Sequence, residues 1–498
     1  MTVSTNMGKI QKTKDLDCLV EVELETQGKQ GVYSDLSAMS NLKAKSEFNT
    51  GNLLEKIVDR RNFFEAYRKV VANKGSHGVD GIKVDELLPF LQEHYETLKA
   101  DLLSGKYKPQ PVKRVEIPKP NGGIRLLGIP TVVDRLIQQA INQVINPIFD
   151  REFSDNSYGF RPGRSAHMAL KQAQKHINDG YKYVVDMDLE KFFDNVNHDL
   201  LMHSVARKIK DKRVLKLIRK YLNSGIMLKG MLVKSEEGTP QGGPLSPLLS
   251  NILLDELDKE LERRGHRFCR YADDSNIYVK SIRAGERVLK SITKFLEQKL
   301  KLKVNAEKSA VSSPTKTKFL GYSFYYGKGG IKFRVHDKSY ERLKEKIKHA
   351  TNRNISMNFN FRIKKLNEII VGWINYFKLA DMKSKLSELD KWIRRRLRAC
   401  VWKTWKKIKT RFKNLMKLGV PKDKAWEFAN TRKGYWRISK SPILNKTVTN
   451  QRLTNHGFKS LSSQYEKLIY LKKIYTRGID ISIIAYERII LRKIFENR

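Results

Sequence analysis

A polar tetrapeptide between two short β-rich runs restricts the fold more than any other feature of this sequence. The runs are Phe268–Tyr271 and Asn276–Val279, and Ala272-Asp273-Asp274-Ser275 joins them. Two strand patterns joined by so few residues predict a β-hairpin with adjacent aspartates in its turn. A third aspartate, Asp188, lies near the end of the buried-strand pattern Val184–Leu189. The sequence therefore predicts a sheet with carboxylates at the ends of its strands.

Carboxylates at strand ends are costly unless cations neutralise them, and a pair of Mg²⁺ ions would do so. In two-metal sites, one ion activates a hydroxyl and the other stabilises a leaving phosphate group. Because side chains alternate along a strand, Asp273 and Asp274 cannot face one ion equally. We predict Asp188 and Asp273 as the main ligands, with Asp274 in support and Mn²⁺ as a substitute metal. The alternative is a solvated polar turn, in which aspartates are common.

The chain carries a large positive charge, because 98 Lys and Arg face 53 Asp and Glu and leave a formal net charge of +45. Such a chain repels itself unless a polyanion neutralises it, and nucleic acid is the usual polyanion. A basic soluble protein such as a ribosomal factor is the alternative. The three cysteines lack disulfide or metal-ligand spacing, and no signal peptide or membrane-spanning run is evident. We therefore expect a cytoplasmic protein that binds nucleic acid and no membrane.

Local patterns divide the chain into five stretches of different character. The first is nearly neutral and lacks apolar periodicity, which predicts a flexible extension. Helical patterns fill the second, short β-rich runs alternate with helices in the third, and basic helices fill the last two. These stretches cover residues 1–50, 51–110, 111–335, 336–415 and 416–498.

The most basic segment, residues 391–422, holds thirteen Lys or Arg and no acidic residue. Trp392, Trp402 and Trp405 are interleaved with these cations. The combination is suited to phosphate contacts and base stacking in an RNA complex. The alternative is helix packing for the tryptophans, which we expect for at least one of them, and solvation for the charges.

The sequence around the aspartates resembles a known family. Tyr271-Ala272-Asp273-Asp274 is similar to the signature of reverse transcriptases. Residues 186–198 resemble the first catalytic motif of group II intron maturases, with the metal-binding aspartate at Asp188. The resemblance implies that Phe193 is the aromatic gate that excludes a ribonucleotide 2′-hydroxyl. Two neighbours are expected to be structural instead, namely Phe192 and Asp186.

The resemblance also implies a nucleotide pocket. Residues 238–247 resemble the family's nucleotide-binding turn, in which glycines let the backbone approach a nucleotide and Gln241 can form a hydrogen bond. Residues 117–130 resemble the fingers hairpin, where Lys119 and Arg125 would hold the incoming triphosphate. Spacing carries this inference, because any exposed hairpin of so basic a chain would hold cations.

Further cations receive roles from the same resemblance. Lys308 matches the family's lysine that protonates pyrophosphate, with a solvated lysine as the alternative. Arg161 and Arg164, in the block 157–165, are the implied contacts of template or primer phosphates. The remaining predicted nucleic-acid contacts are Arg394, Arg395, Arg396, Arg398, Lys403, Lys406 and Lys407.

The implied fold class is α+β, a right-hand polymerase with fingers and an antiparallel palm sheet. A helical extension of the fingers spans 51–110, and the fingers and palm together span 111–335. A helical thumb, or maturase domain, spans 336–415, where Gly372-Trp373-Ile374-Asn375-Tyr376-Phe377 resembles the family. A small helical DNA-binding region with an extra helical tail completes the chain at 416–498. The Cys/His cluster of the family's endonuclease is not evident, which predicts the bacterial type that lacks this domain.

The implied function is an RNA-directed DNA polymerase that binds its group II intron RNA, assists splicing and copies the intron into DNA during retrohoming. Its partners would be intron RNA, an RNA template/DNA primer duplex, target DNA and dNTPs, with nucleoid association when it acts on DNA. One alternative is a domesticated relative in defence or repair. Another is a splicing cofactor with an idle polymerase, against which the intact aspartates argue. The oligomeric state stays open.

Overall fold

The computed structural model of the chain describes residues 50–118, 122–228, 231–233, 238–239 and 242–476. The chain divides into two compact units, residues 1–52 and 53–498, and all elements below belong to the second. The predicted flexible extension up to residue 49 and the predicted tail beyond residue 476 lie outside the described residues.

The N-terminal helices form where the apolar periodicity predicts them. They are α3 (Leu53–Ile57), α4 (Arg60–Asn73) and α5 (Leu87–Leu103), with a 3₁₀ turn at Val84–Glu86 before α5. The Asp59 carboxylate caps α4 by accepting hydrogen bonds from the amides of Arg61 and Asn62. The helix ends at Lys74, whose left-handed backbone (φ 46°) stops it.

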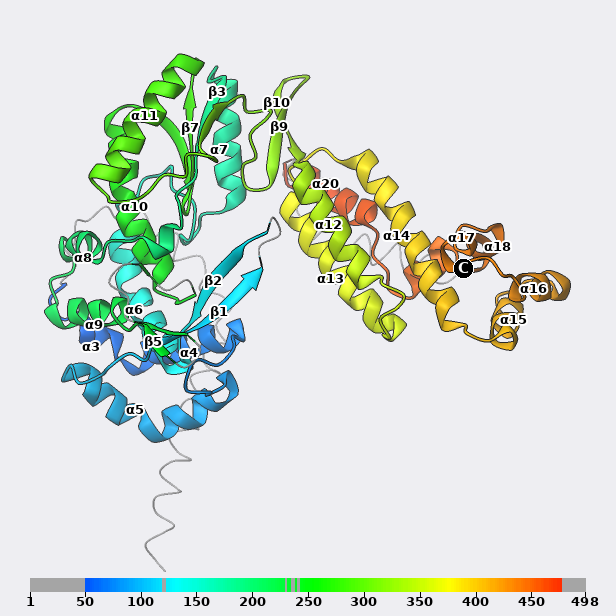
Figure 1. Cartoon of the computed structure of the whole chain (residues 1–498), viewed down its shortest axis with the longest axis horizontal. Coiled ribbons are helices and arrows are strands. Elements are labelled where there is room, and N and C mark those ends of the chain that lie inside the picture. The colour runs from blue at the N-terminus through cyan, green and yellow to red at the C-terminus, as the bar shows by residue number, and fades with distance from the viewer. Residues whose placement is uncertain (1–49, 119–121, 229–230, 234–237, 240–241, 477–498) are drawn as a thin grey trace, which may run out of the picture. The chain divides into compact units, whose positions relative to one another are not determined.

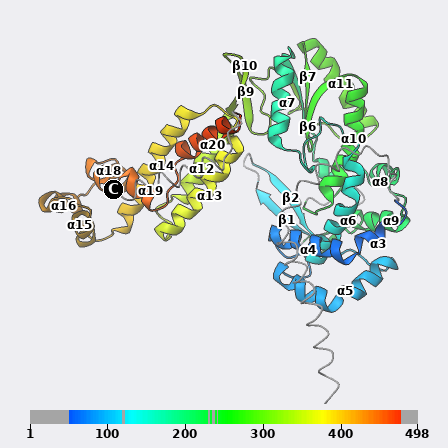
Figure 2. The ribbon, with the colours of Figure 1, turned by 180° about the vertical axis from the view of Figure 1, so that it is seen from behind.

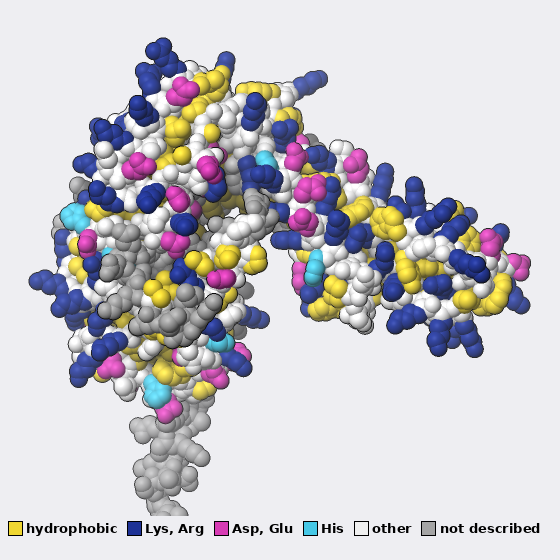
Figure 3. All heavy atoms as spheres, viewed as in Figure 1, with side chains coloured by type: hydrophobic (Ala, Val, Ile, Leu, Met, Phe, Trp, Pro, Cys, Tyr) yellow, Lys and Arg dark blue, Asp and Glu magenta, His cyan; other side chains and the backbone are white. Residues whose placement is uncertain are grey.

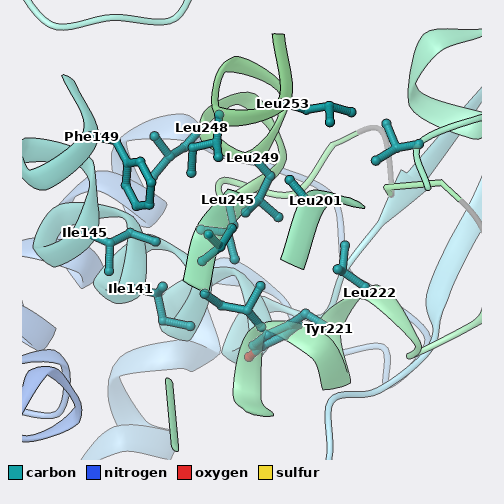
Figure 4. Close-up of a cluster of buried hydrophobic side chains, with 14 of the residues drawn as sticks. Ile141, Ile145, Phe149, Leu201, Tyr221, Leu222, Leu245, Leu248, Leu249 and Leu253 are labelled. Carbon is teal, nitrogen blue, oxygen red and sulfur yellow. The ribbon is translucent and has the colours of Figure 1, made fainter. Parts of the chain in front are cut away.

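A long buried helix, α6 (Val132–Asp150), links these helices to the rest of the core. Figure 4 shows Ile141, Ile145 and Phe149 of α6 facing the leucines of α10 (Ser246–Arg263). The nearby helices α8 (His198–Ala206) and α9 (Lys212–Leu222) contribute to the same core. Burial of these side chains supplies the main driving force that holds this part together.

The predicted fingers hairpin is present. Strands β1 (Val112–Pro118) and β2 (Ile124–Ile129) are antiparallel. Strand β1 also pairs in parallel with β4 (Ile226–Leu228), which pairs with β5 (Met231–Val233), so that the sheet order is β2-β1-β4-β5.

The palm sheet has the order β6-β7-β3-β8 with antiparallel neighbours throughout. Its strands are β6 (Arg267–Tyr271), β7 (Asp274–Val279), β3 (Tyr183–Met187) and β8 (Ala310–Ser312). Helices α7 (Ala166–Asn178) and α11 (Ile282–Gln298) pack against it, as Figures 1 and 2 show. The antiparallel palm sheet predicted from the sequence is therefore confirmed.

Each face of this sheet belongs to a different core. Val185 lies in the core that contains α11, whereas Val184 lies in the core that contains α7 and the C-terminal helices. Because side chains alternate along a strand, Asp186 and Asp188 continue the face of Val184. The carboxylates thus emerge on the side of the sheet that packs toward the C-terminal part of the chain.

Helices dominate after the sheet, as predicted, and no strand follows residue 335 in the part of the chain described. A hairpin of β9 (Tyr322–Gly327) and β10 (Gly330–Val335) comes first. The helices that follow are α12 (Asp337–Ala350), α13 (Phe359–Phe377), α14 (Lys383–Thr404), α15 (Ile408–Lys417), α16 (Lys422–Ala429), α17 (Tyr435–Ile438), α18 (Pro442–Thr447), α19 (Asn450–Asn455) and α20 (Leu461–Thr476).

Helix α20 returns to pack on α13 and α14 rather than extending the C-terminal region. The buried carboxylate of Asp390 on α14 accepts hydrogen bonds from the amides of Leu461 (2.8 Å) and Ser462 (2.9 Å). The Tyr465 hydroxyl donates to the Ala380 carbonyl (2.7 Å). Among the described residues, no helix combines the length and the apolar character needed to span a bilayer.

Candidate active site

The sheet register brings the predicted aspartates together. Asp186 pairs with Asn276 across β3 and β7, and Met187 pairs with Ser275. The next step of this register sets Asp188 opposite Asp274, the first residue of β7. Asp273 occupies the turn immediately before it.

Burial and mutual repulsion both act on the carboxylates of this cluster. Burial, reinforced by Asp186, Asp273 and Asp188, raises the pKa of Asp274 to about 8. Burial and the neighbouring Asp188 also raise the pKa of Asp186 to about 6. Asp186, which we expected to be structural, therefore belongs to the same cluster. The two-residue spacing of Asp186 and Asp188 was the sequence signal, because such residues share a face of a strand.

The donor set of this cluster fits a divalent ion. Carboxylate oxygens are the ligands that Mg²⁺ prefers, and a cation would offset the repulsion that adds to burial in raising the pKa of Asp274. Within the described residues, no three Asp, Glu, His or Cys side chains already enclose a common metal position. The cluster therefore has the chemistry of a metal site without its closed geometry.

Lys308 lies beside Asp188, with 3.0 Å between Nζ and Oδ2. Backbone contacts set this position: the Asp188 amide donates to Ser309 Oγ (3.1 Å), and the Asn305 amide donates to the Asp188 carbonyl (2.9 Å). The side chains of Lys308 and Asp188 are 65% and 43% exposed, so the ion pair contributes little to stability. The lysine can therefore leave the carboxylate at small cost when another cation binds.

The backbone of the aspartate turn packs closely against Gly159. Ala272 adopts a left-handed backbone (φ 60°), and a positive φ is typical of the first central residue in a two-residue hairpin turn. Its amide nitrogen lies so close to Gly159 that a Cβ at Gly159 would sit 2.2 Å from it. Glycine is required at 159 because two backbones meet there.

Gly159→Ala is expected to lower the thermal stability and to displace the turn. The new methyl would meet backbone atoms, which cannot rotate away, and overpacking of this kind typically costs about 1–3 kcal/mol. Gly372→Ala is the matched control, because a Cβ at Gly372 in α13 meets nothing within 4 Å. That control should be neutral or stabilising, since alanine is the better helix former. Equal melting temperatures for the two variants would contradict the close packing at Gly159.

The predicted gate and nucleotide-binding turn lie together. Phe193 belongs to a 3₁₀ turn at Phe192–Asp194, and its carbonyl accepts a hydrogen bond from the Thr239 amide (2.6 Å). The Gly238 amide donates to the Val196 carbonyl (2.8 Å). Phe192 is buried in the core, as expected, whereas Phe193 remains partly exposed. The start of the glycine-rich turn is thus fixed directly to the backbone of the gate segment.

Three predicted nucleotide-binding side chains are not described by the structure. Lys119 and Gln241 lie outside the described residues. The backbone of Arg125 pairs with Ile117 in the fingers hairpin, but its side chain is not described. Their roles remain predictions.

Arg161 is nearly fully buried and cannot contact a phosphate at the surface, contrary to the prediction. Its side chain is 4% exposed and pairs with Asp150 (2.6 Å). The guanidinium also donates to the carbonyls of Asp150, Ser154 and Ser157. Arg164 is more exposed and pairs with the solvated Asp155 (2.5 Å), so it remains a candidate.

Several arginines of α14 hold the C-terminal helices together. Arg395 lies 3.8 Å from the ring centre of Trp436 and donates to its carbonyl (3.0 Å). Arg396 donates to Thr351 Oγ1 (2.5 Å), and Arg398 donates to the Val448 carbonyl (3.0 Å). A run of basic residues in the sequence is compatible with both roles, so it does not show whether an arginine packs between helices or binds nucleic acid.

Other cations of the basic segment remain available. Lys406 and Lys407 are exposed, Arg394 is partly exposed, and Lys403 lies 4.9 Å from the ring centre of Tyr435. Figure 3 shows Lys and Arg side chains crowding the visible surface of the helices after α13. Trp402 is fully buried, which confirms that at least one tryptophan packs in the core.

Two protein families match consecutive parts of the chain. Residues 117–324 match the family described as reverse transcriptase (RNA-dependent DNA polymerase). Residues 340–419 match the group II intron, maturase-specific domain. The first match contains the aspartate cluster, and the second begins within α12 and ends just after α15.

Two curated proteins and one solved structure are similar to parts of the chain. Protein YkfC of Escherichia coli (strain K12) is 36% identical over 299 residues, which cover 52% of this chain and 78% of that protein. The group II intron-encoded protein LtrA of Lactococcus lactis subsp. cremoris is 32% identical over 334 residues, 54% of this chain and 55% of LtrA. A solved partial Cas6-RT-Cas1–Cas2 complex gives a TM-score of 0.33 at 25% identity, over 49% of this chain and 42% of that chain.

Proposed function

Because this chain belongs to the reverse transcriptases and carries a group II intron maturase-specific domain, we propose that Asp188, Asp273 and Asp274 hold two Mg²⁺ ions for RNA-directed DNA synthesis. The sheet register that sets Asp188 opposite Asp274, with Asp273 in the adjoining turn, is the observation that carries this assignment. Mn²⁺ would substitute for Mg²⁺, since both accept carboxylate oxygens. When bound, the ions would activate a primer 3′-hydroxyl and neutralise the departing pyrophosphate.

The protein side chains around the cluster receive complementary roles in this proposal. Phe193 stands beside the nucleotide-binding turn as the gate against a 2′-hydroxyl. Lys308 pairs with Asp188, and it would be free to face the phosphates of the incoming dNTP once a cation neutralised that carboxylate. Lys119, Arg125 and Gln241 would hold the triphosphate and the base.

We further propose that the protein binds group II intron RNA, assists its splicing and copies it into DNA at a target site. The maturase-specific domain and the similarity to a group II intron-encoded protein support this proposal. The template/primer duplex, target DNA and dNTPs are the remaining partners. The protein's part in splicing would be binding energy and charge neutralisation of the folded RNA.

The direct test is extension of a DNA primer on an RNA template by the whole chain with Mg²⁺. Extension with dNTPs and poor extension with rNTPs is the expected result. A protein that binds RNA tightly but extends no primer, with either Mg²⁺ or Mn²⁺, would overturn the polymerase assignment and leave a splicing cofactor.

Removal of exposed charge from the basic segment should weaken RNA binding and flatten its salt dependence. The appropriate variant replaces Lys406, Lys407 and Lys409 by alanine, because these residues are exposed. Arg395 and Arg396 are unsuitable, since they hold Trp436 and Thr351. Each lost phosphate contact should lower the slope of log K against log salt by about 0.7–0.9, as measured by RNA binding at several salt concentrations.

A matched control removes the same charge elsewhere. Lys290, Lys294 and Lys299 are exposed along and just after α11. Their replacement by alanine lowers the net charge equally and should leave the salt slope nearly unchanged. Equal slopes for both triple variants would exclude the basic segment from the interface.

A further inference from the structure

Directly behind the aspartate turn lies a fully buried arginine, Arg270, which is 0% exposed. Its Nε and Nη2 atoms donate hydrogen bonds to the two carboxylate oxygens of Asp258, which is equally buried. The second Nη2 bond goes to Ser157 Oγ (2.8 Å). Nη1 donates to Asn251 Oδ1 and to the Ala272 carbonyl, both at 2.9 Å. All five N–H donors of the guanidinium are therefore used.

These bonds join segments that are distant in the sequence. Asn251 and Asp258 lie on α10, and Ser157 lies in the loop before α7. The Arg270 amide donates to the Asn156 carbonyl, and the Tyr158 amide donates to the Arg270 carbonyl, each at 2.9 Å. The same loop continues into Gly159, which contacts the Ala272 backbone. The Arg270 guanidinium therefore connects the aspartate turn to α10 and to the loop before α7.

Stability alone does not explain this network. Apolar side chains of similar size often replace a buried ion pair without loss of stability. Here, however, one donor is aimed at the carbonyl of Ala272, a non-glycine residue with a left-handed backbone. Such a conformation persists only where surrounding contacts determine it. The bond therefore fixes the peptide that leads directly into Asp273.

We propose that Arg270 is a positioning residue for the Asp273-Asp274 turn. It holds the turn through Ala272 while repulsion among the carboxylates acts to spread them. Asp258 neutralises the guanidinium, Asn251 and Ser157 orient it, and none of these side chains needs to touch a nucleotide. This inference rests on the proposed function, since it concerns the geometry of the same metal-binding cluster.

The test is Arg270→Lys, which keeps the positive charge beside Asp258 but cannot reproduce the planar five-donor pattern. Mn²⁺ binding is measured by electron paramagnetic resonance, and the signal of Asp273→Asn is subtracted to remove binding outside the aspartate cluster. The affinity for Mn²⁺ should weaken about tenfold. The kcat of primer extension should fall about 100-fold, because small displacements of reacting groups have effects of this size. The KM for dNTP and the affinity for RNA should stay within about twofold of the unaltered protein.

Arg362→Lys is the matched control. Arg362 is also buried, but it donates to the carbonyls of Ala350, Asn352 and Ile355 within the C-terminal helices. Its loss should lower the melting temperature without changing the Mn²⁺ midpoint. The positioning role is overturned if Arg270→Lys behaves in the same way, with activity lost only in proportion to unfolded protein.

Two further outcomes, an unfolded Arg270→Lys variant and a protein without polymerase activity, can be distinguished from loss of the positioning role. If Arg270→Lys does not fold, Ser157→Ala removes a single acceptor and should shift the Mn²⁺ midpoint in the same direction by a smaller factor. An unchanged midpoint in that variant would refute the proposal. If the unaltered protein binds Mn²⁺ but extends no primer, the proposed function fails, while the Mn²⁺ comparison still decides the role of Arg270.

Discussion

Asp273→Asn should reduce Mg²⁺-dependent extension of a DNA primer on RNA at least about 1,000-fold. The substitution keeps the shape of the side chain and removes one of the charges that would hold the ions. Metal ions contribute several kcal/mol of transition-state stabilisation, and each 1.36 kcal/mol changes a rate tenfold. Single-turnover extension with saturating template and primer measures the effect on chemistry without a contribution from binding.

The same variant should keep its fold and its affinity for RNA. In the metal-free protein the substitution removes one of the carboxylates whose repulsion adds to burial in raising the pKa of Asp274 to about 8. The melting temperature should therefore stay equal or rise. Asp199→Asn serves as a control, because Asp199 is 83% exposed and pairs with Arg219 on the surface. Parallel loss of extension, RNA binding and melting temperature in Asp273→Asn would mean that the aspartates are structural.

The sequence predicts the sheet well because its signals are local. The tetrapeptide at 272–275 specifies a hairpin, and alternation along Val184–Leu189 specifies a buried strand. The structure confirms both, together with the fingers hairpin and the helices that follow residue 335. The pairing of β3 with β7 joins strands far apart in the chain, and the family resemblance rather than periodicity indicated it.

The roles of the arginines were less predictable, for a physical reason. Arg161 and Arg396 occupy basic motifs, yet one is nearly fully buried and the other donates to Thr351 and the carbonyl of Lys348. A guanidinium binds a phosphate or a carbonyl with the same donors, so that composition cannot tell an interface from a packed joint. Only the tertiary structure shows whether a given arginine faces a phosphate or a carbonyl of the protein. Arg270 shows the same ambiguity, because it immediately precedes Tyr271-Ala272-Asp273-Asp274 and yet is fully buried.

Phe193→Val should admit ribonucleotides and lower the preference for dNTPs over rNTPs. The expected change is about 10- to 200-fold, because removing a few atoms from an apolar pocket changes discrimination by this much. The backbone of Phe193 is held by the Thr239 amide, which should keep the 3₁₀ turn in place when the ring is trimmed. The ratio of kcat/KM for dNTP and rNTP on the same template measures the preference.

The neighbouring ring gives the control for this prediction. Phe192 lies 5.2 Å from Phe193 between ring centres, but it is buried in the core. Phe192→Leu should therefore lower the melting temperature and leave the nucleotide preference unchanged. If Phe193→Val reduces the use of both nucleotides equally, the ring only packs against its surroundings and another group must exclude the 2′-hydroxyl. If preference changes in Phe193→Val alone, the partly exposed ring acts on the sugar, because the two substitutions trim adjacent rings of the same 3₁₀ turn.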